Sequence, residues 1–159
     1  MSVVFPQADA PCAICALHAD AAELAAHEVW RSELWLLRHH PQPAPLPGWC
    51  LLDARRHCSG PIEFDAAEAR NWGVMVQRAS ELVRRVTGCD RVYAVAFGEG
   101  ARHLHLHLIP RCVSDPRTSA WRIADLYRDV EAGKVRAASA DCVTDWMLCA
   151  RALAPSLLD

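Results

Sequence analysis

Three histidines alternate with leucines in the stretch 103–109, which reads HLHLHLI. Successive side chains of a β-strand point to opposite faces, so His103, His105 and His107 are predicted to share one face and the leucines the core face. Histidines two residues apart lie about 6.6–7 Å apart at Cα, so one phosphate can contact two of them. Imidazole serves as a nucleophile, a proton donor or a metal ligand. The pattern favours phosphate chemistry, with a metal site or a half-exposed strand as alternatives.

A second motif with possible chemistry is Cys12-Ala-Ile-Cys15. Two intervening residues allow both thiolates to bind one tetrahedral zinc ion, which needs two further ligands. His18 and Cys58 are rival candidates for a third ligand. A redox dithiol is the first alternative, although the βαβ pattern that usually accompanies it is missing. Two plain buried thiols are the second alternative.

Length and composition fit one domain spanning residues 1–159. The net charge of −2 gives no overall attraction to nucleic acid or to an anionic membrane. No apolar run approaches the roughly 20 residues that span a bilayer, and no signal peptide is recognisable. Most of the eight cysteines stand singly in apolar stretches, as do Cys50, Cys142 and Cys149. We interpret them as buried thiols, which favours a reducing cytoplasm.

The elements that must position these motifs follow from periodicity and turn signals. Apolar spacing of three and four predicts a long helix that opens at residues 65–68 and ends at Gly88. Shorter helices are expected at 20–27, 122–131 and 142–153, and strands at 28–31, 34–38, 49–53, 92–97 and 102–109, the last stopped by Pro110. A Pro-rich loop covers 39–48. The order lacks βαβ alternation, so we expect an antiparallel α+β domain.

The histidine pattern resembles the signature of the histidine-triad (HIT) superfamily, in which three histidines alternate with apolar residues. Pro110-Arg111 resembles its usual continuation, and the segment 45–57 (PLPGWCLLDARRH) is similar to its Pro/Gly loop, buried strand and basic-basic-His segment. The similarity covers residues 12–111, and 112–159 form a C-terminal extension. The resemblance implies a HIT-like fold with an antiparallel sheet of about five strands, a long packing helix and C-terminal helices.

The resemblance also implies a reaction. His105 would attack the α-phosphorus of a nucleoside phosphoramidate or dinucleoside polyphosphate and form a nucleotidyl-histidine, which water then hydrolyses. His107 would stabilise charge on the phosphoryl oxygens. The expected ligand is a purine nucleotide or nucleotide conjugate. A nucleotidyltransferase is an alternative, but that branch typically has Gln in place of the third histidine. A non-catalytic nucleotide- or zinc-binding module is another.

Members of the superfamily with an N-terminal cysteine pair belong to a zinc-bearing branch. The resemblance implies a structural zinc ion bound by Cys12, Cys15, His57 and His103, while the reaction itself needs no metal. Members commonly pair through the long helix and a strand, so a homodimer is expected.

Two positions depart from the superfamily pattern. Glu99 and Gly100 stand where Gln and then Ser or Thr usually contact the phosphate and the leaving group. We therefore assign both to substrate binding together with His107. Trp49 follows Gly48 where a histidine is common. Trp49 and Trp35 could stack on a base, but we expect both to pack. His39 and His40 are predicted to be exposed in the Pro-rich loop, although such a loop borders the nucleotide pocket in this superfamily.

Overall fold

The computed structural model describes residues 11–98 and 100–159. Its centre is a five-stranded antiparallel sheet in the order β1-β2-β3-β5-β4. The strands are β1 (Glu28–Arg31), β2 (Trp35–His39), β3 (Cys50–Ala54), β4 (Arg91–Val95) and β5 (His105–Arg111). The α-helices are α1 (Ala13–Ala19), α2 (Ala21–His27), α3 (Ala66–Thr87), α4 (Ile123–Glu131) and α5 (Ala140–Leu158), with 3₁₀ turns at Pro61–Glu63 and Pro116–Thr118. The predicted antiparallel α+β fold is confirmed.

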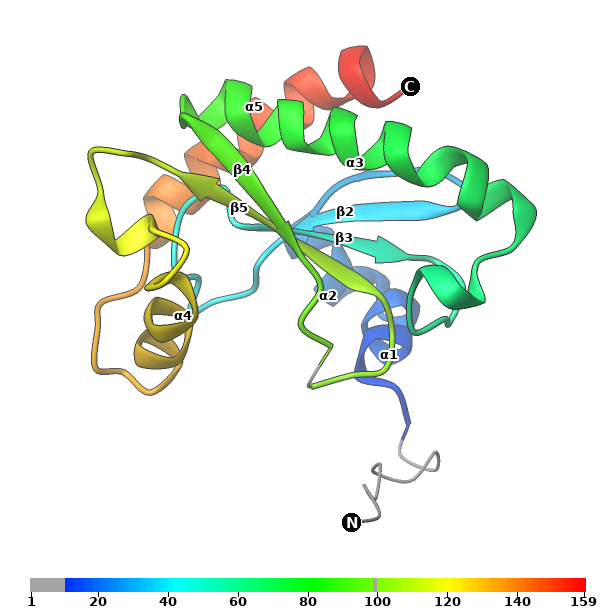
Figure 1. The fold of residues 1–159 in the computed structure, drawn as a ribbon, viewed down its shortest axis with the longest axis horizontal. Coiled ribbons are helices and arrows are strands. Elements are labelled where there is room, and N and C mark those ends of the chain that lie inside the picture. The colour runs from blue at the N-terminus through cyan, green and yellow to red at the C-terminus, as the bar shows by residue number, and fades with distance from the viewer. Residues whose placement is uncertain (1–10, 99) are drawn as a thin grey trace.

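The two faces of the sheet have different partners. Helices α3 and α5 cover one face, whereas α1, α2 and α4 lie on the other side (Figure 1). Leu37, Leu52 and Leu106 are neighbours across three strands and belong to the main core with α3 and α5. Residues one position along each strand point the opposite way. His107 is therefore directed to the face away from α3.

The long helix α3 is defined at both ends by its sequence. The Asp65 side chain accepts the backbone N–H of Glu68, and the Glu68 side chain accepts the N–H of Asp65, which forms a capping box. Gly88 ends the helix with φ 68°, a left-handed conformation that glycine adopts without a Cβ clash. The helix buries Met75, Ala79, Leu82 and Val83 against the sheet, which holds the central strands in place.

Several predicted boundaries were wrong. Strand β5 begins at His105 rather than at residue 102, and it continues through Pro110. Strand β3 pairs with β5 only up to Leu108, so Pro110 has a strand neighbour on one side alone and its missing N–H is tolerated. Helix α1 was not predicted, because its N-cap residue, Cys12, makes no side-chain capping hydrogen bond, whereas Asp20 caps the equally short α2. Cys142 and Cys149 were expected to be buried, but both are exposed on α5.

Within the part of the chain that the structure describes, no helix combines the length and the apolar character that crossing a bilayer requires.

Candidate catalytic cavity and metal site

A cavity of about 1010 Å³ lies on the sheet face opposite α3. The sheet supplies its floor through Arg38, Leu51, His105 and His107, and further walls come from α1, α2, the Pro-rich loop and α4. The register explains this floor, because Arg38 pairs with Leu51 and Leu51 pairs with His107 across adjacent strands. Its volume is at the upper end of the range of roughly 300–1,000 Å³ that small-molecule sites occupy.

His105 is half-buried at the cavity, and one of its ring nitrogens is committed to the backbone. Its Nδ1 lies 2.6 Å from the carbonyl oxygen of His103, which can only accept a hydrogen bond. Nδ1 therefore carries the proton in neutral His105, and the lone pair is on Nε2. This is the tautomer that a nucleophilic imidazole needs.

His107 has the opposite tautomer. The indole N–H of buried Trp49 donates to His107 Nδ1 over 3.0 Å, so the proton of neutral His107 is on Nε2. Burial, with the neighbouring His105 as the next cause, lowers the pKa of His107 to about 3. The ring centroids of His105 and His107 are 5.4 Å apart. The pair thus presents a lone pair and an N–H donor side by side.

Aromatic rings lie beside His107, and one of them also contacts a further imidazole, His40. Phe97 contacts it edge-on at 5.0 Å between centroids, and Tyr127 of α4 lies 6.2 Å away. Tyr127 also packs edge-on against His40, whose Nδ1 donates to the Pro41 carbonyl at 2.8 Å. Residues 112–159 therefore contribute a wall of the cavity through α4, although their sequence gave no functional motif.

The prediction that His39 and His40 are exposed was wrong. His39 is fully buried, where its Nδ1 donates to the His40 carbonyl and its Nε2 accepts the N–H of Gly48. His40 is half-buried at the cavity. Burial lowers the pKa of each ring to about 4, so both are neutral at pH 7. The Pro-rich loop folds back over these rings instead of extending into solvent.

A buried ion pair lies beside the histidines. Arg38 donates from Nε to Asp53 Oδ2 at 2.6 Å and from Nη2 to Oδ1 at 3.3 Å. His18 Nε2 lies 3.0 Å from Asp53 Oδ2. Burial alone would raise the pKa of Asp53, but the hydrogen bonds from His18 and Arg38 and the charge of Arg38 hold it below its usual value. Asp53 is therefore a carboxylate next to His105, its register partner on β5.

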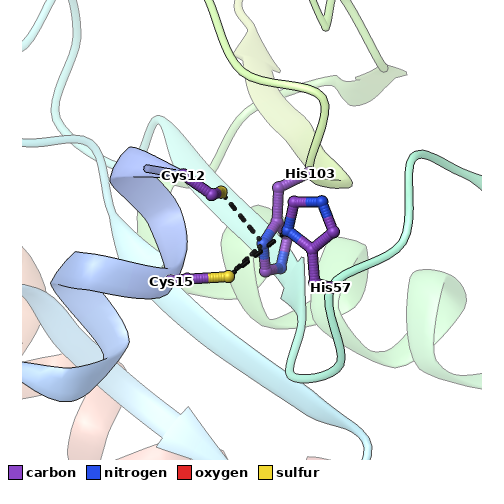
Figure 2. A group of neighbouring side chains, drawn as sticks. All are labelled: Cys12, Cys15, His57 and His103. Carbon is purple, nitrogen blue, oxygen red and sulfur yellow. Dashed lines mark hydrogen bonds between the residues drawn. The ribbon is translucent and has the colours of Figure 1, made fainter. Parts of the chain in front are cut away.

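Cys12, Cys15, His57 and His103 form a second cluster outside the cavity, with one ligand atom from each within 4.8 Å of the others (Figure 2). Cys15 Sγ lies 3.3 Å from His57 Nδ1 and 3.4 Å from His103 Nδ1, and Cys12 Sγ lies 3.5 Å from His103 Nδ1. Ligands of a tetrahedral zinc ion are about 3.5 Å apart when sulfur and nitrogen bind at about 2.3 and 2.0 Å. The donor set and spacing fit zinc.

The local structure explains this cluster. Cys12 caps α1 and Cys15 is in its first turn, so a three-residue step puts both thiols on one side of the helix. His103 lies just before β5 and is 1% exposed, and its Nε2 donates to the Ala54 carbonyl at 2.6 Å. Such an outer hydrogen bond orients a metal-ligating histidine. The rivals are elsewhere: His18 binds Asp53, and Cys58 is outside the cluster.

The two other predicted substrate-binding residues are Glu99 and Gly100. Gly100 is exposed and lines the cavity, whereas Glu99 is outside the described residues. Arg111 binds carbonyl oxygens of the following turn and Thr118 Oγ1, so it fixes the end of β5 rather than reaching the cavity. Trp35 packs in the core with its indole N–H on Asn71.

Sequence reasoning missed Arg38, Asp53 and Tyr127. A signal for the first two was present, because Arg38 and Asp53 are each the one residue with a full charge at neutral pH in a strand whose other residues are mostly apolar. Opposite charges in consecutive buried strands indicate a buried ion pair. Tyr127 had no such signal, since only the folded chain shows that α4 faces the sheet.

Comparison with known proteins identifies this architecture. No family profile and no curated protein matches the chain. Among solved structures, a hypothetical histidine triad nucleotide-binding protein from Sulfolobus tokodaii strain7 superposes with TM-score 0.65 at 17% identity, covering 92% of this chain and 93% of its own. A zinc-bound histidine triad family protein from Mycobacterium smegmatis gives 0.65 and 17%, covering 92% and 94%. A histidine triad protein from Bradyrhizobium japonicum gives 0.59 and 21%, covering 83% and 93%.

These likenesses establish the class: the chain has the fold of the histidine-triad proteins. The fold implied by the resemblance of residues 12–111 is thereby confirmed.

Proposed function

We propose that this chain is a member of the HIT superfamily and hydrolyses a nucleoside phosphoramidate or a dinucleoside polyphosphate at its α-phosphate. The observation that carries the proposal is the hydrogen bond from His105 Nδ1 to the His103 carbonyl, 2.6 Å long, on a ring that lines a nucleotide-sized cavity. A neutral imidazole with its Nε2 lone pair available is a nucleophile for phosphorus. The name of the Sulfolobus tokodaii protein, a nucleotide-binding protein, agrees with the ligand class.

The proposed reaction has two displacements. The Nε2 lone pair of His105 attacks the α-phosphorus, the bond from phosphorus to the leaving nitrogen or oxygen breaks, and the leaving group takes up a proton. The Nε2–H of His107 donates to a phosphoryl oxygen as negative charge develops. Water then attacks the nucleotidyl-histidine, which releases the nucleoside monophosphate and one proton and returns the electron pair to His105.

Zinc fits the cluster of Cys12, Cys15, His57 and His103, and we propose that it binds there in a structural role. It would tie α1 to the segment that precedes β5. His105 and His107 are not among the four ligands, so their ring nitrogens stay available for the substrate.

We further propose a cytoplasmic homodimer of single-domain chains that includes the extension 112–159. Within residues 11–98 and 100–159, β4 pairs with one strand only, so this edge of the sheet is available for a second copy.

Steady-state hydrolysis of adenosine phosphoramidate and of a diadenosine polyphosphate tests the function. We expect turnover by the native chain, loss of at least about 10³-fold in His105→Ala, and a smaller loss in His107→Ala. His57→Ala is unsuitable as a control because it removes a proposed zinc ligand, whereas Arg55→Ala changes a side chain that donates to the Ser32 carbonyl outside the cavity.

The Arg55→Ala variant should therefore retain native turnover. Nucleotide binding without turnover of either compound would contradict hydrolysis and favour a binding module. Transfer of the nucleotidyl group to an added acceptor at the expense of hydrolysis would favour a transferase.

A further inference from the structure

Arg38 combines deep burial with access to the cavity. Arg38 is 2% exposed, yet it lines the cavity floor. It lies in line with Leu51 and His107 across the adjacent strands β3 and β5. A buried cation is costly unless it is paired and hydrogen-bonded. Asp53, which is fully buried, supplies this partner through the two hydrogen bonds described above. Arg38 lines the cavity and Asp53 does not, so Arg38 is the member of this ion pair that borders the open space.

The pairing with Asp53 leaves much of the guanidinium unused. An arginine has five N–H groups, and the fork to Asp53 takes two of them. The other three have no side-chain or backbone acceptor among residues 11–98 and 100–159. Of the side-chain polar atoms described, only Arg111 Nε and Trp146 Nε1 are both buried and unpartnered. Nη1 of Arg38 makes no hydrogen bond to the described residues and is not among these buried atoms, so we take it to be open to the cavity that Arg38 lines.

The position of Arg38 relative to the histidines limits what it can bind. Adjacent strands are about 4.8 Å apart, so two strand spacings separate Arg38 from His107 by about 10 Å at Cα. This distance is short enough for one small ligand to contact His105 and His107 with one chemical group and Arg38 with another. Guanidinium presents its donors in a plane that matches the oxygens of a phosphate, and Asp53 fixes that plane in advance.

We propose that Arg38 binds a second phosphate group of the substrate, in addition to the α-phosphate at His105 and His107. This inference rests on the proposed function. It predicts a substrate class of nucleotides that carry a second phosphate group, either on the ribose, as in a ribose-phosphorylated nucleoside monophosphate derivative, or along a polyphosphate chain. Among the described residues, the acidic side chains that line the cavity are Asp20, Glu23 and Glu131, and all three are exposed to solvent, which screens their charge from the buried guanidinium.

Calorimetric titration of the native full-length chain with four nucleotides tests the proposal. The probes are AMP, ADP, adenosine 2′,5′-bisphosphate and adenosine 3′,5′-bisphosphate. We expect at least one doubly phosphorylated nucleotide to bind about tenfold or more tightly than AMP. The preferred probe tells whether the second phosphate lies on the ribose or along the polyphosphate chain. Equal or weaker binding of all three overturns the proposal.

Substitutions test whether Arg38 causes the tighter binding of the doubly phosphorylated nucleotide. In Arg38→Gln the ratio of the AMP dissociation constant to that of the preferred probe should fall to about one. The double variant Arg38→Gln with Asp53→Asn gives the same result without a buried unpaired carboxylate, and it covers the case in which Arg38→Gln does not fold. Arg128→Gln is the matched control, because Arg128 also lines the cavity but is exposed and paired with Asp125.

The ratio should persist in Arg128→Gln, and its loss there as well as in Arg38→Gln would overturn the assignment to Arg38. If AMP binds and adenosine phosphoramidate is hydrolysed but a second phosphate adds nothing, this inference fails and the proposed function stands. If none of the four nucleotides binds and no phosphoramidate is hydrolysed, both fail.

Discussion

The hydrogen bond from Trp49 to His107 makes the tautomer of a phosphate-contacting histidine depend on a core tryptophan. The substitution Trp49→Phe keeps an aromatic ring in the core and removes the indole N–H that donates to His107 Nδ1 over 3.0 Å. A neutral hydrogen bond contributes about 1 kcal/mol net, which corresponds to about fivefold in a rate or an equilibrium. Without it, Nδ1 can carry the proton, and Nε2 then has none to donate to the phosphoryl group.

We therefore expect kcat for adenosine phosphoramidate to fall about fivefold in Trp49→Phe. The pKa of His107, which burial lowers to about 3, should rise by about 0.7, because Nδ1 no longer accepts a bond that only the unprotonated nitrogen can make. Steady-state kinetics measure the first effect, and ¹⁵N NMR of the imidazole measures the tautomer and the pKa.

Trp35→Phe is the matched control for the loss of packing. Trp35 is as fully buried as Trp49, but its indole N–H donates to Asn71 at 2.8 Å, away from the cavity. Both variants remove the same atoms from the core, so a difference in kcat between them reports on the hydrogen bond to His107. Equal kcat values, or a His107 that keeps its proton on Nε2 in Trp49→Phe, would refute the reasoning.

Three further perturbations test the metal site, the Pro-rich loop and the buried histidines. Cys15→Ser should lose bound zinc and melt at a lower temperature, whereas Cys142→Ser, exposed and outside the cluster, should retain stoichiometric zinc in elemental analysis. Zinc content equal in the two would contradict the site. Gly48→Ala should destabilise the fold by about 1–3 kcal/mol in urea titration, because φ is 81° and a Cβ would lie 2.4 Å from a side-chain carbon. In Gly73→Ala the added Cβ meets nothing within 4 Å, so this substitution should stabilise the fold by about 0.5–1 kcal/mol. A Gly48→Ala variant more stable than Gly73→Ala would be inconsistent with this geometry. His39, whose pKa burial lowers to about 4, binds its proton more readily in the unfolded chain, so its contribution to stability is lost as pH falls from about 6.5 to about 4. In this pH range the free energy of unfolding should decrease with falling pH in both proteins, but the slope in His39→Gln should be smaller by up to about 1.4 kcal/mol per pH unit. Identical slopes in the two proteins would exclude His39 as the cause.

Local patterns in the sequence were sufficient for the elements with strong periodicity or capping. The apolar spacing between Asp65 and Gly88 predicted α3, and the alternation of histidine and leucine predicted the direction of His107 away from the main core. The resemblance also named the four residues of the Cys/His cluster, which come from three segments separated by more than 40 positions. These features depend on residues that are close in sequence or share a recognisable motif.

Features that depend on long-range packing were not predictable in the same way. The exposure of His39 and His40 was wrong because a Pro-rich composition indicates a loop but does not show what the loop covers. Here the loop backbone supplies the hydrogen-bond partners of the buried His39 ring, which are the His40 carbonyl and the Gly48 N–H. The start of β5 was misplaced because His103 leaves the strand to join the cluster with Cys12 and Cys15. Alternation alone could not distinguish a strand residue from its immediate neighbour.

The central claim is that His105 attacks the phosphorus, and trapping the covalent intermediate tests it most directly. The protein is mixed with adenosine phosphoramidate, quenched in alkali within a single turnover, digested and analysed by mass spectrometry. The account predicts an added AMP group on the peptide that contains the triad, located to His105 by fragmentation and absent from His105→Ala. An AMP group on another residue, or hydrolysis that continues in His105→Ala, would contradict it.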